Sequence, residues 1–192
     1  MPSRRVSLIK KEARILGLAA TTKRLKRVPV IGIVYRGNLW LDGIFKCQVE
    51  RGPRERLSGL VQAIVQSRQY SQIHAVILPR ENLAPGIRIE ISDFSRKINL
   101  PVLSIIKKRT FSHRKIAGHQ SRQRRARLKV ERFRIKIAGR LVHLRAAGLS
   151  SEEAHEIFAI ACASGQWIPE AVRVAQIVAE NAANCELFPE RK

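Results

Sequence analysis

Cysteine is scarce in this sequence of 192 residues, and the three cysteines lie far apart. Cys47, Cys162 and Cys185 form no C-x-x-C pair, so neither a disulfide framework nor a zinc site is expected. We expect the three thiols to be small buried side chains in a reducing compartment.

Aromatic residues make up only 5% of the chain, which excludes a base-stacking surface built from many rings. Long apolar runs are also absent. No 18-residue apolar stretch occurs, and no signal-type segment follows the basic N-terminus. We therefore expect a soluble, cytoplasmic protein with no membrane partner. Hydrophobic residues still account for 45% of the chain, enough for a folded core.

Acidic residues are few, with 15 Asp and Glu against 37 Lys and Arg. A Mg²⁺ site for phosphodiester cleavage needs several converging carboxylates. The six acids of residues 28–106 form no D-x-D type signature; they are Asp42, Glu50, Glu55, Glu81, Glu90 and Asp93. No histidine or serine motif of a known hydrolase occurs either. The residues alone predict no catalytic group, no metal site, no cofactor and no small-molecule substrate.

The basic residues that give the net charge of +22 are concentrated in two segments. Residues 1–27 hold nine basic residues and one acid, and residues 107–140 hold fourteen and one. Such a block repels itself unless a partner supplies the counter-charge. Structured RNA, rich in phosphates, is the partner that this pattern favours. The predicted RNA-binding residues are Arg4, Arg5, Lys10, Lys11, Lys23, Arg24, Lys26, Arg27, Arg51, Arg54, Arg80, Lys107, Lys108, Arg109, Arg114, Lys115, Arg122, Arg124, Arg125, Arg127, Lys129, Arg132, Arg134 and Lys136.

Hydrophobic periodicity predicts an α/β fold. Strands are expected over 13–20, 28–35, 39–50, 73–78 and 101–106, and helices over 54–70 and 89–98. After residue 106 we expect helical patterns only, including a docked helix in the second half of 107–140. Ser150 and Glu153 form a capping box that opens a helix through Ala163, and another helix starts at Pro169.

We expect this order to correspond to four regions. Residues 1–12 form a basic arm, and residues 13–106 form an α/β core. Residues 107–140 are the basic RNA-binding segment, and residues 141–192 are C-terminal helices packing on the core.

Several stretches resemble the mostly archaeal endonuclease dU family. They are VPVIGIVYRGNLWLDGIFKCQVE, SRQYSQIHAVIL, INLPVLSIIKKR and the C-terminal GLSSEEAHEIFAIACASGQWIPEAVRVAQIVA. That family is related to endonuclease V and has a ribonuclease-H-like fold. The resemblance implies a mixed five-stranded sheet flanked by helices, with a basic N-terminal arm, a basic central extension and C-terminal helices.

The departures from that family fall where it keeps its acidic residues. A Gly-Ile-Asp-Asp type motif corresponds here to Gly17-Leu18-Ala19-Ala20. An Asp-Gly-x-Asp type element matches Arg51-Gly52-Pro53-Arg54, and a Leu-Asp-Gly motif matches Leu78-Pro79-Arg80. The resemblance thus implies the fold without its catalytic acids, with phosphate lying against Arg51, Arg54 and Arg80.

These observations predict a structural RNA-binding protein and not an enzyme. It would be a lineage-specific archaeal ribosomal protein or ribosome-associated factor, binding rRNA through basic extensions on a catalytically inactive nuclease-like domain. The ribosome is a ribonucleoprotein, so neighbouring ribosomal proteins would be further partners. The alternative is a metal-dependent endonuclease acting on damaged DNA or RNA, with a relocated site at Asp42, Glu50 and Glu55. A DNA-coating chromatin protein is the third hypothesis.

Overall fold

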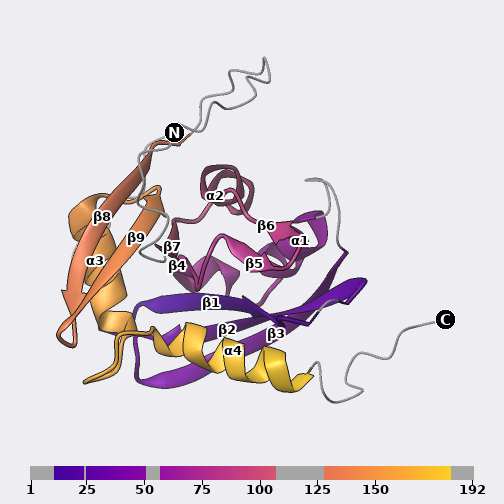
Figure 1. Ribbon diagram of the computed structural model, residues 1–192, viewed down its shortest axis with the longest axis horizontal. Helices are drawn as coiled ribbons and strands as arrows, with labels where there is room; N and C mark the ends of the chain where they lie inside the picture. Colours follow the sequence, from indigo (N-terminus) through magenta and orange to yellow (C-terminus); the bar gives the residue numbers. More distant parts are fainter. Residues whose placement is uncertain (1–10, 24, 51–56, 107–127, 183–192) are drawn as a thin grey trace.

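One mixed sheet of seven strands runs through the molecule, in the order β3-β2-β1-β4-β7-β9-β8 (Figure 1). The computed structural model describes residues 11–23, 25–50, 57–106 and 128–182. The strands are β1 (Arg14–Ala20), β2 (Arg27–Arg36), β3 (Trp40–Glu50), β4 (Ile73–Leu78), β7 (Val102–Ile106), β8 (Val130–Ile137) and β9 (Arg140–Ala147). A separate two-stranded ribbon consists of β5 (Asn82–Ala84) and β6 (Ile87–Arg88).

Helices cover both faces of this sheet and make a three-layered molecule (Figure 1). Helices α1 (Ser58–Val65) and α2 (Ile91–Ile98) pack on one face, which we refer to as the α2 face. Helices α3 (Ser151–Ala161) and α4 (Glu170–Ala182) pack on the other. A short 3₁₀ helix, η2 (Tyr70–Gln72), leads from α1 into β4.

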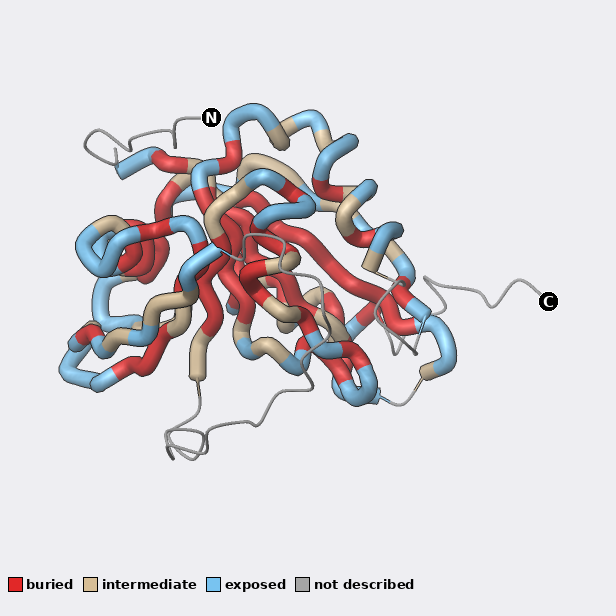
Figure 2. Tube along the Cα trace, turned by 90° about the horizontal axis from the view of Figure 1, so that it is seen from above, coloured by how far each residue is buried: buried red, intermediate tan, exposed pale blue. Residues whose placement is uncertain are grey.

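The central strands are buried on both faces, as Figure 2 shows by the red tube through the middle of the molecule. Strand β1 is antiparallel to β2 and parallel to β4, and β4 is parallel to β7. Strands covered by helices on both faces are expected to read as continuous apolar runs. The sequences VPVIGIVY and IHAVIL have that character, which explains why they occupy the centre of the sheet.

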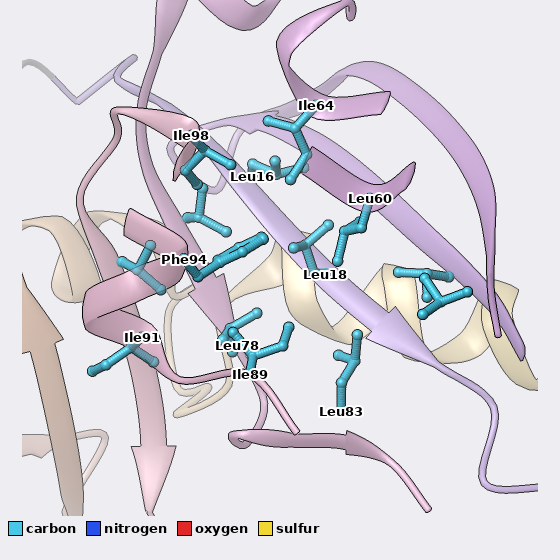
Figure 3. Packing of buried hydrophobic residues seen from close by; sticks show 14 of the residues in the cluster. Leu16, Leu18, Leu60, Ile64, Leu78, Leu83, Ile89, Ile91, Phe94 and Ile98 are labelled. Carbon is cyan, nitrogen blue, oxygen red and sulfur yellow. The ribbon is translucent and has the colours of Figure 1, made fainter. Parts of the chain in front are cut away.

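The core on the α2 face gathers around Phe94 of α2 (Figure 3). Leu16 and Leu18 of β1 point from the sheet toward Leu60 of α1 and Phe94, and all four side chains are at most 1% exposed. Leu16 and Leu18 lie two residues apart, so they share one face of the strand. The residues between and beside them face the opposite layer.

On the opposite face, α4 lies directly against the backbone of β1. A Cβ atom added to Gly17 would lie 2.3 Å from the backbone carbon of Ala171. Glycine is therefore required at this position because α4 approaches the strand without room for a side chain. Helix α3 begins with the predicted capping box: the Glu153 N–H donates to Ser150 Oγ at 3.2 Å, and the Ser150 N–H donates to Glu153 Oε2 at 2.8 Å.

The expected α/β class and the expected strands are confirmed. Strands β1, β2, β3, β4 and β7 fall within a residue or two of the ranges expected from the sequence. The helix expected over 54–70 is shorter, covering Ser58–Val65, and residues 51–56 lie outside the described residues.

The expectation of helices only after residue 106 is wrong. Residues 130–147 form the antiparallel hairpin β8–β9, and β9 pairs with β7 to extend the sheet. The signal was strict alternation along β8, where Phe133, Ile135 and Ile137 pack toward α3 while the basic residues between them do not. A period of two indicates a strand. The many basic residues of this segment obscured that period, and a docked helix was expected instead. The division of the chain into four regions stays a prediction.

The described cysteines behave as apolar side chains. Cys162 is buried and Cys47 half-buried, and both thiols are free. Burial raises the pKa of each thiol to about 12, so at neutral pH both remain protonated and poor as nucleophiles or metal ligands. Cys185 lies outside the described residues. Among the described helices, none is both long and apolar enough to cross a bilayer.

We predict that Gly17→Ala destabilises the protein by roughly 1–3 kcal/mol, because the added methyl group must push α4 away from β1. Gly59→Ala in α1 is the matched control. Its nearest neighbour would lie at 3.9 Å, and alanine favours a helix by about 1 kcal/mol over glycine. Urea unfolding of both variants checks this. Equal stability of the two variants would contradict the close α4–β1 contact.

Candidate nucleic-acid interface

One edge of the sheet carries the carboxyl ends of five strands. Strands β1, β4 and β7 are parallel, and β3 and β8 run in the same direction because each is separated from them by one antiparallel strand. We refer to this side as the carboxyl edge. In open α/β sheets ligands bind just outside the carboxyl ends of the strands. A binding site is therefore expected at the carboxyl edge.

The ends of β1 and β4 lie side by side at this edge and carry no carboxylate. Ala19 and Ala20 end β1, and Leu78 ends β4, followed by half-buried Pro79 and exposed Arg80. Ala19, Ala20 and Pro79, the described positions that the resemblance matched with acids, thus lie at the ends of two neighbouring strands. Arg51 and Arg54, matched with a third acidic element, lie outside the described residues.

The loop after β1 is tied down by a carboxylate from α4. The Thr21 hydroxyl donates to Glu180 Oε2 at 3.2 Å, and the Thr22 N–H donates to Glu180 Oε1 at 3.0 Å. Thr21 is fully buried. Glu180 therefore anchors the end of β1, a role that its place in an ordinary helical pattern did not indicate.

A network of arginines and glutamates lies beyond the end of β4, centred on Glu81. This carboxylate accepts from Arg145 Nη1 of β9 and lies 3.6 Å from Arg88 Nη2. Arg145 Nη2 also lies 3.9 Å from Glu90 Oε1. The side chains of Glu81 and Arg145 are only 14% and 17% exposed, so water screens this ion pair poorly.

The backbone around Glu81 explains its fixed position. The N–H groups of Leu83 and Ile89 both donate to the Glu81 carbonyl, at 3.0 and 2.8 Å, which closes the β5–β6 ribbon. Arg145 stands opposite Ser104 of β7 in the sheet register. In the described part of the chain, Ser104 Oγ and Arg145 Nε are buried without a hydrogen-bond partner. Arg145 was not among the predicted site residues, because a single arginine in an apolar strand gave no signal.

Basic residues predicted to bind RNA gather on β8. Arg132, Arg134 and Lys136 are exposed and share the α2 face of this strand. We refer to these three residues as the basic shelf. In the register of the hairpin, Arg132 stands opposite Arg145 and Arg134 stands opposite His143. The shelf is thus continuous with the network around Glu81.

The other described residues of the prediction are dispersed. Lys23, Lys26, Arg27 and Arg80 lie around the carboxyl edge, and Lys11 lies near the opposite end of β1. Arg27 is 3.5 Å from Glu50, and Lys129 is 3.1 Å from Glu131. The remaining predicted residues lie outside the described residues: Arg4, Arg5, Lys10, Arg24, Arg51, Arg54, Lys107, Lys108, Arg109, Arg114, Lys115, Arg122, Arg124, Arg125 and Arg127.

The relocated acidic site considered for the alternative is not assembled by the fold. Asp42 and Glu50 lie eight residues apart on one strand, which separates them by roughly 27 Å. Asp42 is occupied by the guanidinium groups of Arg14 and Arg36 near the amino end of β1. Glu55 lies outside the described residues. Asp42 and Glu50 therefore cannot share a metal ion.

The described residues do not fit a divalent cation. No group of three His, Cys, Asp or Glu side chains converges anywhere in residues 11–23, 25–50, 57–106 and 128–182. At the carboxyl edge, Glu81 is already neutralised by arginines that would repel a cation. What these groups can do is hold phosphate, because guanidinium binds phosphate oxygens bidentately.

We predict that Arg145→Met lowers the free energy of unfolding by about 2–3 kcal/mol, because it leaves Glu81 poorly exposed and without its main partner. The double variant Glu81→Gln with Arg145→Met should lose less than the sum of the two single changes. Arg96→Met is the control, since its pair with Asp93 is solvent-exposed. Strictly additive losses in urea unfolding would show that Glu81 and Arg145 do not interact.

A second prediction concerns acid stability. The hydrogen bond from Arg14 is the largest influence that lowers the pKa of Asp42 below its ordinary value. A lowered pKa in the folded state contributes stability at neutral pH that is lost as pH falls through the folded value. Wild type should therefore lose more stability than Asp42→Asn between pH 6 and pH 3. Parallel loss in both, measured by thermal unfolding, would contradict the assignment.

Comparison with known proteins connects this architecture to a family. The sequence model described as Endonuclease dU matches residues 11–183. A UPF0215 protein of Methanothermobacter thermautotrophicus is 28% identical over 185 residues, covering 89% of this chain and 88% of that protein.

Two solved structures show the same fold. A protein of unknown function from Archaeoglobus fulgidus superposes with a TM-score of 0.64 at 19% identity, covering 89% of this chain and 97% of that one. Endonuclease V (D234N) of Ciona intestinalis, bound to DNA containing an inosine followed by a ribo-adenosine, gives a TM-score of 0.56 at 11% identity, covering 90% and 86%. The expected ribonuclease-H-like fold is confirmed, with β8 and β9 added to the five strands.

The expectation of a ribosomal, non-enzymatic protein is wrong. The matched family model is that of an endonuclease, and the fold is that of endonuclease V; neither points to a ribosomal component. That expectation rested on two observations, the absence of the family's acidic motifs and the strong positive charge. Neither observation shows that the endonuclease function has been replaced by a structural one. A match over residues 11–183 shows that the chain belongs to the endonuclease dU family.

Proposed function

We propose that this protein is an endonuclease that binds nucleic acid along the carboxyl edge of its sheet and cleaves its phosphodiester backbone. The observation that carries the proposal is the match to the endonuclease dU family over residues 11–183, a range that includes every described residue. The endonuclease V of Ciona intestinalis, which shares the fold, is bound to inosine-containing DNA. Nucleic acid with a deaminated base is therefore the substrate class to test first.

The charges around the carboxyl edge support the binding step. Lys23, Lys26 and Arg80 are exposed there. Lysine and arginine neutralise phosphates and release condensed counterions, so binding should weaken steeply with salt. Such contacts position a backbone without reading its sequence.

Glu81 is the described carboxylate that lies closest along the chain to the end of β4, and we assign it the chemical role. The guanidinium of Arg145 orients its oxygens, and the ribbon β5–β6 fixes its backbone. A carboxylate held in this way can accept a proton from a water molecule whose oxygen forms a bond to the phosphorus of a phosphate near Arg80 and Arg88. The bond from that phosphorus to a sugar oxygen breaks in the same reaction, and the sugar oxygen takes a proton from solvent. No step is assigned to a metal ion, because the described residues do not form a site for one.

The location of the protein is part of the same proposal. The described cysteines are free, and no described helix could span a membrane. Free thiols are typical of reducing compartments. We therefore propose that the protein acts in the cytoplasm.

The test is a cleavage assay on full-length protein with end-labelled oligonucleotides carrying one deoxyuridine, one deoxyinosine or one inosine in RNA. Reactions run in EDTA and with added Mg²⁺ or Mn²⁺, so the requirement for a cation is measured directly. We expect a discrete product from a modified strand and none from the matched unmodified strand. Binding to every strand with no cleavage under any of these conditions would overturn the proposal.

Glu81→Gln should lower the cleavage rate by at least 100-fold while leaving binding unchanged, since a positioned acid or base contributes 10²–10⁴-fold. Asp93→Asn, an exposed carboxylate of α2, is the matched control and should retain the wild-type rate. Similar rates in the two variants would remove Glu81 from the mechanism.

A further inference from the structure

The basic shelf results from a strict sorting of side chains by strand geometry. Along β8, Phe133, Ile135 and Ile137 pack toward α3, on the far side of the sheet. The residues that alternate with them, Arg132, Arg134 and Lys136, are all cationic and all exposed on the α2 face (Figure 1 shows β8 at the outer edge of the sheet). Val130, at the start of the strand, shares this face and packs on the core, so the face carries only positive charge from Arg132 onward.

The α2 face changes character from the centre of the sheet toward this edge. Val76 and Val102, on neighbouring strands, belong to the core under α2. Farther toward the carboxyl ends, the register places Ser104, Arg145 and Arg132 in one row across β7, β9 and β8. On this face α2 packs against β7 and β9, while Arg132, Arg134 and Lys136 of β8 remain exposed.

The charges of the shelf are not balanced within the described chain. Arg145 has Glu81 and Glu90 as partners, whereas Arg132, Arg134 and Lys136 have no carboxylate within ion-pair distance among the described residues. Arg132 also faces Arg145 directly across the hairpin, and like charges at opposed positions destabilise a sheet. A polyanion bound to this surface would remove that repulsion.

The spacing suits a nucleic-acid backbone. Side chains two residues apart on a strand are separated by about 6.8 Å, so the shelf is a straight row of three cations roughly 13–14 Å long. Arginine presents a planar fork to a phosphate, and none of the three shelf side chains is aromatic. The shelf is therefore suited to phosphates and not to stacked bases.

We infer that the basic shelf is a second nucleic-acid contact surface, which binds the phosphate backbone outside the carboxyl-edge site and needs no divalent cation. The class of partner rests on the proposed function; the surface itself rests on the register and charge of β8. The shelf extends the footprint of the protein away from the end of β4, and it contributes affinity without base specificity.

The competing structural role is protection of a sheet edge. β8 is an edge strand, and charged side chains on such strands discourage unwanted pairing with other chains. That role predicts no effect on nucleic-acid affinity when the charges are replaced, so one experiment separates the two.

The test is fluorescence anisotropy of full-length protein with a labelled 20-nucleotide oligothymidylate, in EDTA, over a range of salt concentrations. The triple variant Arg132→Gln, Arg134→Gln and Lys136→Gln removes the shelf. The control triple variant, Arg68→Gln, Arg96→Gln and Lys97→Gln, removes the same charge from exposed residues following α1 and within α2. Both are checked by thermal unfolding.

We expect the shelf variant to bind at least tenfold more weakly at moderate salt and to lower the salt slope by about 2, from roughly 0.7 for each single-strand phosphate contact. The control should change affinity less than twofold. Equal loss in both variants, or no loss in either, would overturn the inference, the second result leaving edge protection as the role of the shelf.

The two proposals fail separately. Shelf-dependent binding by a protein that cleaves no modified strand would retain the shelf and refute the endonuclease. Cleavage by wild type, with affinity unchanged in the shelf variant, would retain the endonuclease and refute the shelf. A wild-type protein that neither binds nor cleaves would refute both.

Discussion

The contact between α4 and the backbone of β1 is the constraint on which the remaining structure depends. β1 hydrogen-bonds to β2 on one side and β4 on the other, and helices cover both of its faces. Gly17 lets α4 approach the strand, and Glu180 near the end of that helix ties down the loop that follows β1. Helix α4 thus fixes the position of the carboxyl end of β1.

The fold determines which charged side chains lie at the carboxyl edge, and therefore which ligands this edge can bind. The strand ends Ala20 and Leu78 offer no side-chain oxygen ligands, and Glu81, the first carboxylate after β4, is held by Arg145 from the added hairpin. The side chains of Glu81 and Arg145 are poorly exposed to water. Water therefore screens their attraction weakly, and the attraction holds the two groups in a fixed orientation. The hairpin β8–β9 therefore does more than widen the sheet: it supplies one half of the network at the edge and all of the basic shelf.

The alternation of side chains along β8 decides which of its residues are buried and which are charged and exposed. Along β8 the alternation of strand side chains separates apolar from basic residues, so a segment with a large excess of charge still contributes Ile135 to the core. Around Asp42 the basic residues have a different role. Two arginines, Arg14 and Arg36, surround this carboxylate and lower its pKa. Arginines thus stabilise the fold around Asp42 and around Glu81, whereas the basic side chains of the shelf are left available for a partner.

The sequence by itself determined the class of fold, the central strands and the family resemblance, because buried strands need continuous apolar runs and those runs are unmistakable in VPVIGIVY and IHAVIL. It also located the capping box of α3, which is a local pattern. Only the tertiary structure brought Arg145 to Glu81, 64 residues away, and only the sheet register placed Arg132 of β8 beside Arg145 of β9. Long-range pairing depends on how strands are ordered in the sheet, and no local spacing records that order. For the same reason, the separation of Asp42 from the carboxyl edge became visible only once the directions of β1, β2 and β3 were known.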